Sequence, residues 1–334
     1  MNHRQVLILR EAEIRSLLDA SGCLQVVEAA FSAYARGQAE LPGVINLEVP
    51  EHHGEVHVKA GHLHTGPYYA VKIASGFLDN AQLGLAASDG MVLMFDAKTG
   101  AVAGLLLDHG YITDLRTGAA GAVAAKHLGG ATVEAVAVIG SGVQARYQIR
   151  CLALVKNFRQ VRVWGRHEEK AAVCIQELSR QGLAADLRFV LASSVREAVQ
   201  GADIVITVTA SREPLVEADW IATGALVIAV GSDGPDKQEL AVEVLARADR
   251  VIADSLPQCL RLGEIHHAVE RGAIASDKVT AELGQITAGF KPGRTSDDEI
   301  IVCDLTGVGV QDVAAASLVL ERALRNGKGE RLSL

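Results

Sequence analysis

Two glycines and an alanine stand at fixed spacing after an apolar run near the middle of the chain. The stretch VAVIGSGVQARYQI places Gly140, Gly142 and Ala145 between a predicted buried strand and a predicted helix. The first glycine allows a tight turn, the second lets the backbone approach a phosphate, and the alanine lets helix and strand pack closely. The helix N-terminus adds free N–H groups and partial positive charge. This pattern predicts a dinucleotide-binding loop.

The end of the next predicted strand, QVRVWG, bears on which dinucleotide is bound. An acid there would hydrogen-bond a free ribose 2′-hydroxyl, whereas an arginine suits a 2′-phosphate. The chain has Gly165, Arg166 and His167 at this point. We therefore expect NADP(H) to be favoured, with Arg166 as a contact, and NAD(H) to be possible. Two alternatives stay open: Arg166 is a solvated surface residue, or Glu168 or Glu169 reaches the ribose.

An aspartate follows another apolar run, ALVIAV, in the stretch VGSDGPDKQEL. Asp233 should stand at the carboxyl end of a strand, the edge at which open α/β sheets bind ligands. We expect a helix to start at Pro235 with Asp236 as its cap, which leaves Asp233 for acid/base chemistry. The glycines beside it, Gly231 and Gly234, would let the backbone pass close to a nicotinamide. The alternative is that Asp233 itself caps the helix.

Two lysines occupy matching positions in the strand-like segments EVHVKAGH and PYYAVKIASGF. Alternate residues of a strand share a face, so His57 points with Lys59, and Ala70 points with Lys72. If these two faces coincide, Lys59 and Lys72 can hold a carboxylate together with Arg116. The alternative is a solvated sheet face or the rim of a dimer interface.

The elements that must position these residues fall into two groups. Residues 24–38 have helical apolar spacing and period-two segments follow, which predicts an α+β unit with a largely antiparallel sheet. From TDLRTGAAGAVAAKHL onward, helical and strand-like segments alternate, as is typical of a doubly wound parallel sheet. The predicted fold is α/β, with a Rossmann-type domain (116–304) inserted into a substrate domain (1–115 plus 305–334) to which the last helix returns.

Composition excludes several function classes for this chain of 334 residues. Its net charge of −8 and the lack of a basic cluster argue against nucleic-acid binding. We find neither a secretion signal nor an apolar run of about 18 residues, and so expect a cytoplasmic protein without a membrane span. The five cysteines form no CxxC pair, which predicts reduced thiols and no metal site. They are Cys23, Cys151, Cys174, Cys259 and Cys303.

Six stretches, in order, resemble the ornithine cyclodeaminase/mu-crystallin family, which includes an archaeal-type alanine dehydrogenase and cyclic-imine and iminosuccinate reductases. They are YYAVKIASGF, ITDLRTGAAGAVAAKHL, IGSGVQA, VGSDGPDKQEL, GEIHHAV and SDDEIIVCDLTGVGVQDVA. The resemblance covers nearly the whole chain. It implies a two-domain subunit and a homodimer formed through the antiparallel sheets of the first domain.

The resemblance also implies roles for matching positions. Lys72 resembles the lysine on the substrate carboxylate, Arg116 the arginine at cofactor phosphate and substrate, and Asp233 the acid/base residue. We add Lys59 and Thr306 as substrate contacts. Besides the glycine loop and Arg166, the expected cofactor contacts are Arg116, Thr117, Val143, Gln144, Thr207, Val230, Gly231, Ser232, Asp233 and Lys237.

Two positions depart from the family pattern. An arginine that commonly follows a proline after the first helix and binds the substrate carboxylate is missing from LPGVINLEVP, around Val44. A serine common in DSTG-like segments is Leu305 here. Both changes touch the expected substrate pocket, so they put ornithine in doubt and leave the substrate open.

We predict an NAD(P)H-dependent oxidoreductase acting on the C–N bond of a small α-imino or α-amino acid, most concretely an imine reductase. Lys72 and Asp233 would be its catalytic residues. The first alternative is a cyclodeaminase, which oxidises an α-amine and returns the hydride with no net cofactor turnover. The second is a non-catalytic binder of NADPH and a small ligand, of mu-crystallin type.

Overall fold

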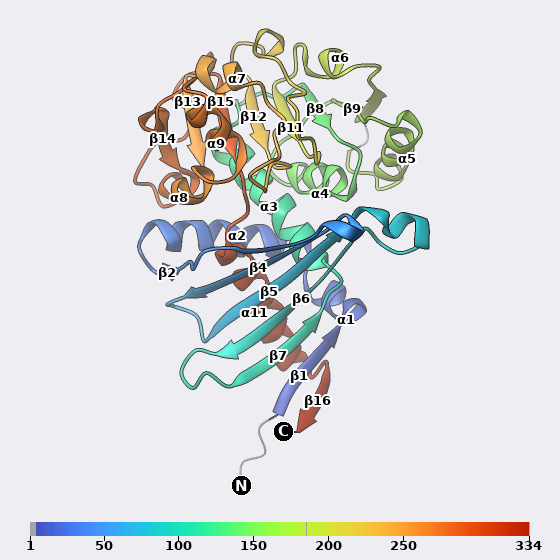
Figure 1. The fold of residues 1–334 in the computed structure, drawn as a ribbon, viewed down its shortest axis with the longest axis vertical. Coiled ribbons are helices and arrows are strands. Elements are labelled where there is room, and N and C mark those ends of the chain that lie inside the picture. The colour runs from blue at the N-terminus through green and yellow to red at the C-terminus, as the bar shows by residue number, and fades with distance from the viewer. Residues whose placement is uncertain (1–4, 185, 334) are drawn as a thin grey trace. The chain divides into compact units, whose positions relative to one another are not determined.

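The computed structural model describes residues 5–184 and 186–333 and divides into two compact units (Figure 1). Unit 1 contains the described residues up to Arg116 together with those from Val308 onward, and unit 2 runs from Thr117 to Gly307. The first boundary falls inside helix α3 (Tyr111–Leu128). The domain limits expected from the sequence lie one and three residues from these boundaries.

Unit 1 is built on one sheet with the strand order β16-β1-β7-β6-β5-β4-β2, in which β3 also pairs with β4. Every pair is antiparallel except β1 with β7, which run parallel, so the sheet is mixed but largely antiparallel. Its strands are β1 (Gln5–Arg10), β2 (Ala39–Glu40), β3 (Ile45–Val49), β4 (Gly54–Leu63), β5 (Tyr68–Phe77), β6 (Ser88–Asp96), β7 (Val102–Leu107) and β16 (Glu330–Ser333).

The last helix of the chain packs on this sheet, as expected from the sequence. Figure 1 shows α11 (Gly309–Asn326) behind β4 and β5, which it contacts. A Cβ on Gly61 of β4 would lie 3.1 Å from Val313 of this helix, so glycine lets helix and strand approach. The other helical segments of unit 1 are α1 (Glu11–Leu17), α2 (Ala20–Ala35), the start of α3, and the 3-10 helices η1 (Pro50–His52) and η2 (Leu78–Leu83).

The two faces of this sheet differ in what covers them. Lys59 lies opposite Lys72, and Gly61 opposite Ala70, and all four are buried on the face that carries α11. The residues between them point to the other face, which holds half-buried apolar side chains such as Val58 and Ile73.

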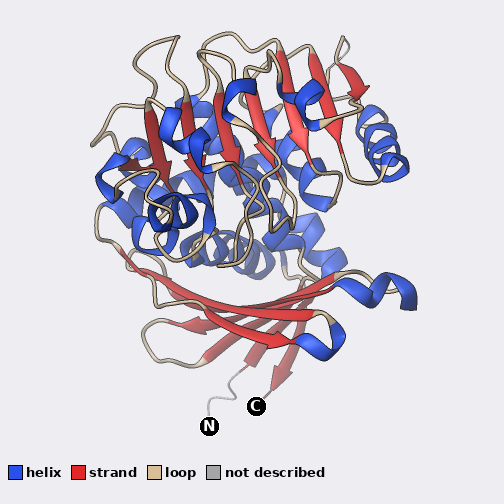
Figure 2. Ribbon diagram, turned by 45° about the horizontal axis from the view of Figure 1, so that its top comes forward, coloured by secondary structure: helices blue, strands red, loops and turns tan. Residues whose placement is uncertain are grey.

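Unit 2 is a doubly wound parallel sheet, which confirms the Rossmann-type prediction. Its strand order is β10-β9-β8-β11-β12-β15-β13-β14, and all pairs are parallel. Figure 2 shows these strands side by side. They are β8 (Ala135–Ile139), β9 (Gln160–Trp164), β10 (Arg188–Leu191), β11 (Ile204–Thr207), β12 (Leu226–Ala229), β13 (Arg250–Ala253), β14 (Val279–Glu282) and β15 (Ile301–Asp304).

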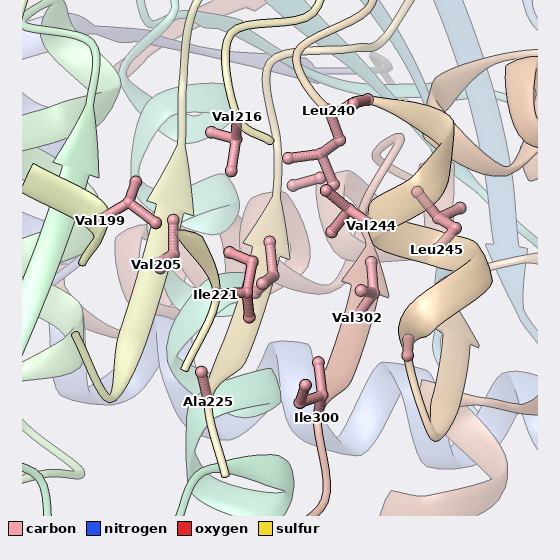
Figure 3. Close-up of a cluster of buried hydrophobic side chains, with 14 of the residues drawn as sticks. Val199, Val205, Val216, Ile221, Ala225, Leu240, Val244, Leu245, Ile300 and Val302 are labelled. Carbon is pink, nitrogen blue, oxygen red and sulfur yellow. The ribbon is translucent and has the colours of Figure 1, made fainter. Parts of the chain in front are cut away.

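Helices cover the sheet of unit 2 because its central strands are apolar on both faces. Every residue of β8, β11, β12 and β15 is buried. Figure 3 shows Val205 and Val302 of the sheet in one cluster with Val199 of α6 and Val244 of α7. Besides the rest of α3, the helical segments are α4 (Val143–Leu152), α5 (Glu168–Ser179), α6 (Val195–Val199), α7 (Val242–Arg247), α8 (Leu256–Cys259), α9 (Gly263–Glu270), α10 (Leu283–Thr287), η3 (Ala218–Trp220) and η4 (Ser276–Lys278).

The strand order of unit 2 reverses between β8 and β11. From β8 the chain proceeds to β9 and β10 on one side, and β11 and β12 lie on the other. Such a switch point is where open α/β sheets bind ligands, outside the carboxyl ends of the strands. The residues that follow Ile139 and Thr207 are therefore the first candidates for a binding site.

Two further expectations can be compared with the described residues. All five cysteines are buried and form no disulfide, as predicted. Within the described ranges, no helix combines the length and apolarity needed to cross a bilayer.

Candidate active site

The loop after β8 has the shape that a dinucleotide requires. Gly140 has a φ of +124°, and a Cβ there would lie 2.7 Å from the carbonyl oxygen of Val208. Gly142 is the N-cap of α4, and no atom lies within 4 Å of the place its Cβ would take. The Cβ position of Gly142, at the start of the helix, is therefore open. These features fit a pyrophosphate.

Arg146 holds this loop and was not anticipated from the sequence. Its Nη1 donates to the carbonyl oxygens of Ser141 (2.8 Å) and Gly142 (2.9 Å), and its Nε pairs with Glu177 (2.5 Å). Because it binds carbonyls, it fixes the turn without consuming the N–H groups that a phosphate needs. Of the predicted contacts in the same helix, Ala145 is fully buried against the sheet and Val143 is exposed.

The end of β9 lies against the glycine loop. A Cβ on Gly165 would come within 2.6 Å of the Ser141 hydroxyl, so glycine is required by this close approach. Arg166 follows in an exposed position, and Glu168 and Glu169 are exposed as well. The arginine and both acids thus stay available for the ribose end of a dinucleotide.

The stretch that carries Asp233 is a loop, which corrects one expectation. Helix α7 begins at Val242 with Ala241 as N-cap, so the expected helix start at Pro235 and cap at Asp236 are wrong. Asp233 Oδ1 accepts a hydrogen bond from Lys237 Nζ at 2.8 Å, although it was expected to have no structural partner. Lys237, expected to reach a phosphate, instead pairs with this carboxylate.

Tertiary hydrogen bonds explain why this stretch is not helical. The backbone N–H of Gln238 donates to the Ser211 carbonyl at 2.8 Å. The N–H groups of Glu239 and Leu240 donate to the two carboxylate oxygens of Glu264. A helix would need these N–H groups for its own carbonyls. Asp233 keeps a side chain that is 42% exposed, so it remains accessible.

Glu239, fully buried, connects the ends of β11 and β12. Its carboxylate accepts hydrogen bonds from the Thr207 hydroxyl (2.7 Å), the Thr209 N–H (2.5 Å) and the Gly231 N–H (2.8 Å). A Cβ on Gly231 would lie 2.7 Å from the carboxyl carbon of Glu239. This glycine is therefore required by the protein's own packing, whereas the sequence had suggested the nicotinamide as the reason.

Glu239 belongs to a group of buried acids at the carboxyl edge of the sheet. Burial raises the pKa of Glu239 to about 7, and it raises the pKa values of Glu264 and Asp304 well above their usual range. Asp304 accepts the N–H of Ile265 at 2.9 Å, which attaches α9 to β15. In a single sequence, such acids are indistinguishable from surface acids, and we missed them.

Thr306, a predicted substrate contact, is engaged within unit 2. Its hydroxyl donates to Asp254 Oδ1 at 2.9 Å and accepts from Gln258 Nε2 at 2.9 Å. Asp254 also accepts the N–H of Gly307, so this network fixes the loop after β15. The role of Thr306 toward a substrate stays a prediction.

The described part of the chain contains one group that could hold a metal ion. His266, His267 and Glu270 of α9 place ligand atoms within 4.8 Å of one another. His267 Nε2, however, lies 2.9 Å from the Lys237 carbonyl, and Glu270 is exposed. Because a carbonyl only accepts, His267 acts here as a donor that holds the Asp233 loop.

Unit 1 gathers three predicted substrate-binding cations around a carboxylate that the sequence did not reveal. Lys72 Nζ lies 3.2 Å from Asp312 Oδ2, and Arg116 Nε donates to Asp312 Oδ1 at 2.8 Å. Arg116 Nη1 also donates to Gln311 Oε1 at 2.8 Å. Lys59 lies directly across the sheet from Lys72, which confirms that the two lysines share a face. All three cations and Asp312 are buried.

The charges in this cluster shift each other's ionisation. Burial lowers the pKa of Lys72 to about 7, against the opposing effect of Asp312, and the charges of Arg116 and Lys59 lower it further. Burial acts to raise the pKa of Asp312, but Arg116, Lys72 and Lys59 outweigh it and leave the pKa below its ordinary value. Three cations and Asp312 thus act on one another on this face of the sheet, and cations of this kind can bind carboxylates.

The predicted site residues thus fall into two sets. Lys59, Lys72 and Arg116 come together in unit 1. The unit 2 set follows the carboxyl ends of its strands, apart from Thr117, which lies in α3. By strand, these residues are Gly140, Gly142, Val143, Gln144 and Ala145 (β8), Arg166 (β9), Thr207 (β11), Val230, Gly231, Ser232, Asp233 and Lys237 (β12), and Thr306 (β15).

Comparisons with known proteins show the family of the chain and similar folds. A model of the ornithine cyclodeaminase/mu-crystallin family matches residues 4–327. The chain is 44% identical to a Sinorhizobium fredii protein named as an uncharacterized cyclodeaminase, over 96% of this chain and 97% of that one. Two solved structures are also similar. An archaeal alanine dehydrogenase dimer with bound NAD has 34% identity and a TM-score of 0.91, with 99% of this chain and 100% of that chain covered. The Thermococcus litoralis Delta(1)-pyrroline-2-carboxylate reductase in complex with NADH and L-proline has 32% identity and a TM-score of 0.93, with 98% and 100% covered.

Replacing Asp312 with asparagine should strongly destabilise the protein. The change leaves buried cations without their counter-charge, which costs about 3–5 kcal/mol in comparable cases. Denaturant unfolding measures the loss. The control is Glu330→Gln, which removes the exposed Arg10–Glu330 pair and should cost less than about 1 kcal/mol. Equal losses in the two variants would contradict the role given to Asp312.

The raised pKa of Glu239 predicts how stability depends on pH. The folded state binds this proton more tightly than the unfolded chain, whose pKa is near 4.5. The protonation of Glu239 therefore stabilises the folded state. Its contribution to the free energy of unfolding is complete below about pH 4.5 and is lost as pH rises through about 7. Between about pH 5 and about pH 8, the wild type should lose about 2–3 kcal/mol more than Glu239→Gln. Denaturant titrations at both pH values measure these free energies of unfolding. If the wild type and Glu239→Gln lose the same amount between the two pH values, the prediction is wrong.

Proposed function

The chain belongs to the ornithine cyclodeaminase/mu-crystallin family, and we propose that it reduces the C=N bond of a small α-imino acid with NAD(P)H. The observation that carries the proposal is the cluster of Lys59, Lys72 and Arg116 around Asp312, in a chain that also has a dinucleotide loop at Gly140. Two similar structures, an alanine dehydrogenase with NAD and a pyrroline-2-carboxylate reductase with NADH and L-proline, act in the same class of chemistry.

The dinucleotide is held, in this proposal, by the carboxyl edge of the unit 2 sheet. The N–H groups at the start of α4 bind the pyrophosphate beside Gly142, where the structure leaves open space. Thr207 at the end of β11 and residues 230–233 after β12 contact its nicotinamide half. When bound, NAD(P)H supplies the hydride.

The substrate carboxylate is bound by the cations of unit 1. Lys72 and Arg116 already share Asp312, and Lys59 adds a third positive charge on the same face. Holding the carboxylate fixes the position of the α-carbon that receives the hydride. These residues therefore replace the arginine that is missing around Val44.

Asp233 exchanges a proton with the substrate nitrogen. It donates the proton to the imine in the reductive direction and accepts one from the amine in the reverse direction. Its carboxylate is partly exposed and is oriented by Lys237 at 2.8 Å. A residue with this task must be both accessible and held in place, and Asp233 satisfies both conditions.

A cyclodeaminase is the second candidate, because the 44% identical Sinorhizobium fredii relative carries that name. Such an enzyme would use the same cations and Asp233 but return the hydride to its own intermediate. NAD(P)H would then not be consumed. A non-catalytic binder of NADPH and a small ligand would need neither Asp233 nor the lysine pair.

Three finer features belong to the same proposal. NADP(H) is favoured over NAD(H), because the exposed Arg166 follows the end of β9, where Rossmann-type folds contact the ribose. The protein acts as a homodimer, like the archaeal alanine dehydrogenase. It works in a reducing compartment such as the cytoplasm, where five free thiols are stable.

The surface we assign to the dimer is the uncovered face of the unit 1 sheet. Ile45, Val58 and Ile73 lie in register across β3, β4 and β5, and Leu47, two residues along β3, shares their face and pairs with Val56. Ile45 is 63% and Leu47 58% exposed. An apolar face of this kind, opposite the face that carries α11, is typical of an interface between subunits.

Steady consumption of NAD(P)H tests the proposed function. We expect one cofactor oxidised per amino acid formed when the protein is scanned over cyclic imines, iminosuccinate, and keto acids with ammonia or methylamine. Asp233→Asn should lower kcat by about 10²–10⁴-fold, a larger change than the one in dinucleotide binding. Turnover of a diamino acid to a cyclic product without net oxidation would favour the cyclodeaminase, and binding without any turnover would favour the binder.

Arg166→Ala should change the cofactor preference. We expect the wild type to prefer NADPH over NADH by at least about tenfold in kcat/KM, the value of one charge-assisted contact. The variant should lose that preference with little change in kcat/KM for NADH. A wild type that prefers NADH, with the preference reduced by Glu168→Gln, would show that the acid and not Arg166 contacts the ribose.

Ile73→Glu should convert the dimer into monomers, because it buries charge in the assigned interface. Light scattering should give twice 35.2 kDa for the wild type and 35.2 kDa for the variant. The control is Lys98→Glu at the exposed tip of the β6–β7 hairpin, which should stay dimeric. A variant that remains dimeric would place the interface elsewhere.

A further inference from the structure

Glu239 takes no part in the proposed reaction, yet it is the group that connects the two strand ends beside the switch point. It is fully buried and makes three hydrogen bonds to residues 207, 209 and 231. We propose that Glu239 is a positioning residue for the dinucleotide, because it holds the ends of β11 and β12 in the arrangement that the cofactor needs. This inference rests on the proposed function.

The contacts of Glu239 lead directly to the residues assigned to the cofactor. Thr207 is the last residue of β11, and Gly231 comes two residues after the end of β12 and two before Asp233. Thr207 Oγ1 and the Gly231 N–H share Oε2, whereas the Thr209 N–H binds Oε1. A shift of this carboxylate would therefore move both loops together.

Glu239 is itself fixed from the opposite side by α9. Its own N–H donates to Glu264 Oε1 at 2.8 Å, and the next N–H, that of Leu240, donates to Glu264 Oε2 at 3.1 Å. His267 of the same helix lies 2.9 Å from the Lys237 carbonyl. The segment that carries Glu239 is thus attached to α9, and α9 is attached to the end of β15 through Asp304.

The hydrogen-bond count shows what each substitution removes. A glutamine at 239 has one accepting oxygen and one NH2 group, so it can accept the Thr209 N–H and donate to the Thr207 hydroxyl. Its NH2 would then face the Gly231 N–H, and that bond is lost. A valine at 207 removes only the hydroxyl bond and keeps the shape of the side chain. Glu239→Gln therefore releases the loop of Asp233, and Thr207→Val releases only β11.

Asp203 offers a matched control at the other edge of the same sheet. Its Oδ2 accepts the N–H groups of Glu134 and Ala135 at 2.8 and 2.9 Å. It precedes β11 and stands at the amino end of the strands, away from the glycine loop. Asp203→Asn removes the charge from carboxylate-to-backbone bonds of the same kind, and so weakens them, without touching the loops assigned to the cofactor.

The test is the Kd of NADPH and NADH, measured by nicotinamide fluorescence on the full chain without substrate. We expect Glu239→Gln to raise Kd about tenfold and Thr207→Val about threefold, as the loss of one charge-assisted bond and of one weaker bond would do. Asp203→Asn should leave Kd within about twofold, although all three variants lower the melting temperature. If Glu239→Gln does not fold, the inference is tested by comparing the Kd of Thr207→Val, which should rise, with that of Asp203→Asn, which should not.

A merely structural role would give a different result. Glu239→Gln would then lower the melting temperature with Kd unchanged, or Asp203→Asn would raise Kd as much, and either outcome overturns the inference. Because no substrate is used, the test is separate from that of the proposed reaction. A wild type that binds dinucleotide but reduces no imine would contradict the proposed function and leave Glu239 testable, whereas a wild type that binds no dinucleotide overturns both.

Discussion

The buried carboxylate of Asp312 is the contact on which the chemistry of unit 1 depends. Lys59 and Lys72 lie directly opposite each other in the sheet, where like charges repel, and Arg116 joins them on the face that carries α11. Burying each charge costs several kcal/mol unless a partner compensates. Asp312 is that partner for Lys72 and Arg116. In the proposed function, the three cations also bind the carboxylate of an anionic substrate.

In unit 2 the buried charged groups are acids, and they accept hydrogen bonds from backbone N–H groups. The loops at the carboxyl ends of its strands carry N–H groups that need acceptors, and Glu239, Glu264 and Asp304 supply them. Burial then acts in opposite directions in the two units. It raises the pKa of Glu239 to about 7 and lowers the pKa of Lys72 to about 7. Both groups change charge near neutral pH, although for different reasons.

The sequence revealed the parts of the site that depend on local pattern. The glycine loop is specified by Gly140, Gly142 and Ala145, which lie close together in the sequence. The shared face of Lys59 and Lys72 follows from the two-residue period of a strand. Asp312 and Glu239 were missed because their partners lie far away: Arg116 is 196 positions from Asp312, and Thr207 is 32 from Glu239. The expected helix at Pro235 failed because Ser211 and Glu264 take the N–H groups that a helix needs.

The central claim is that the buried cations of unit 1 bind the substrate through its carboxylate. Calorimetric titration of the protein, saturated with oxidised cofactor, with the product amino acid and with its carboxamide tests this most directly. The account predicts binding of the carboxylate, about tenfold weaker binding after Lys59→Met, and no measurable binding of the carboxamide. Equal affinity for the acid and the amide, unchanged by the loss of Lys59, would contradict it.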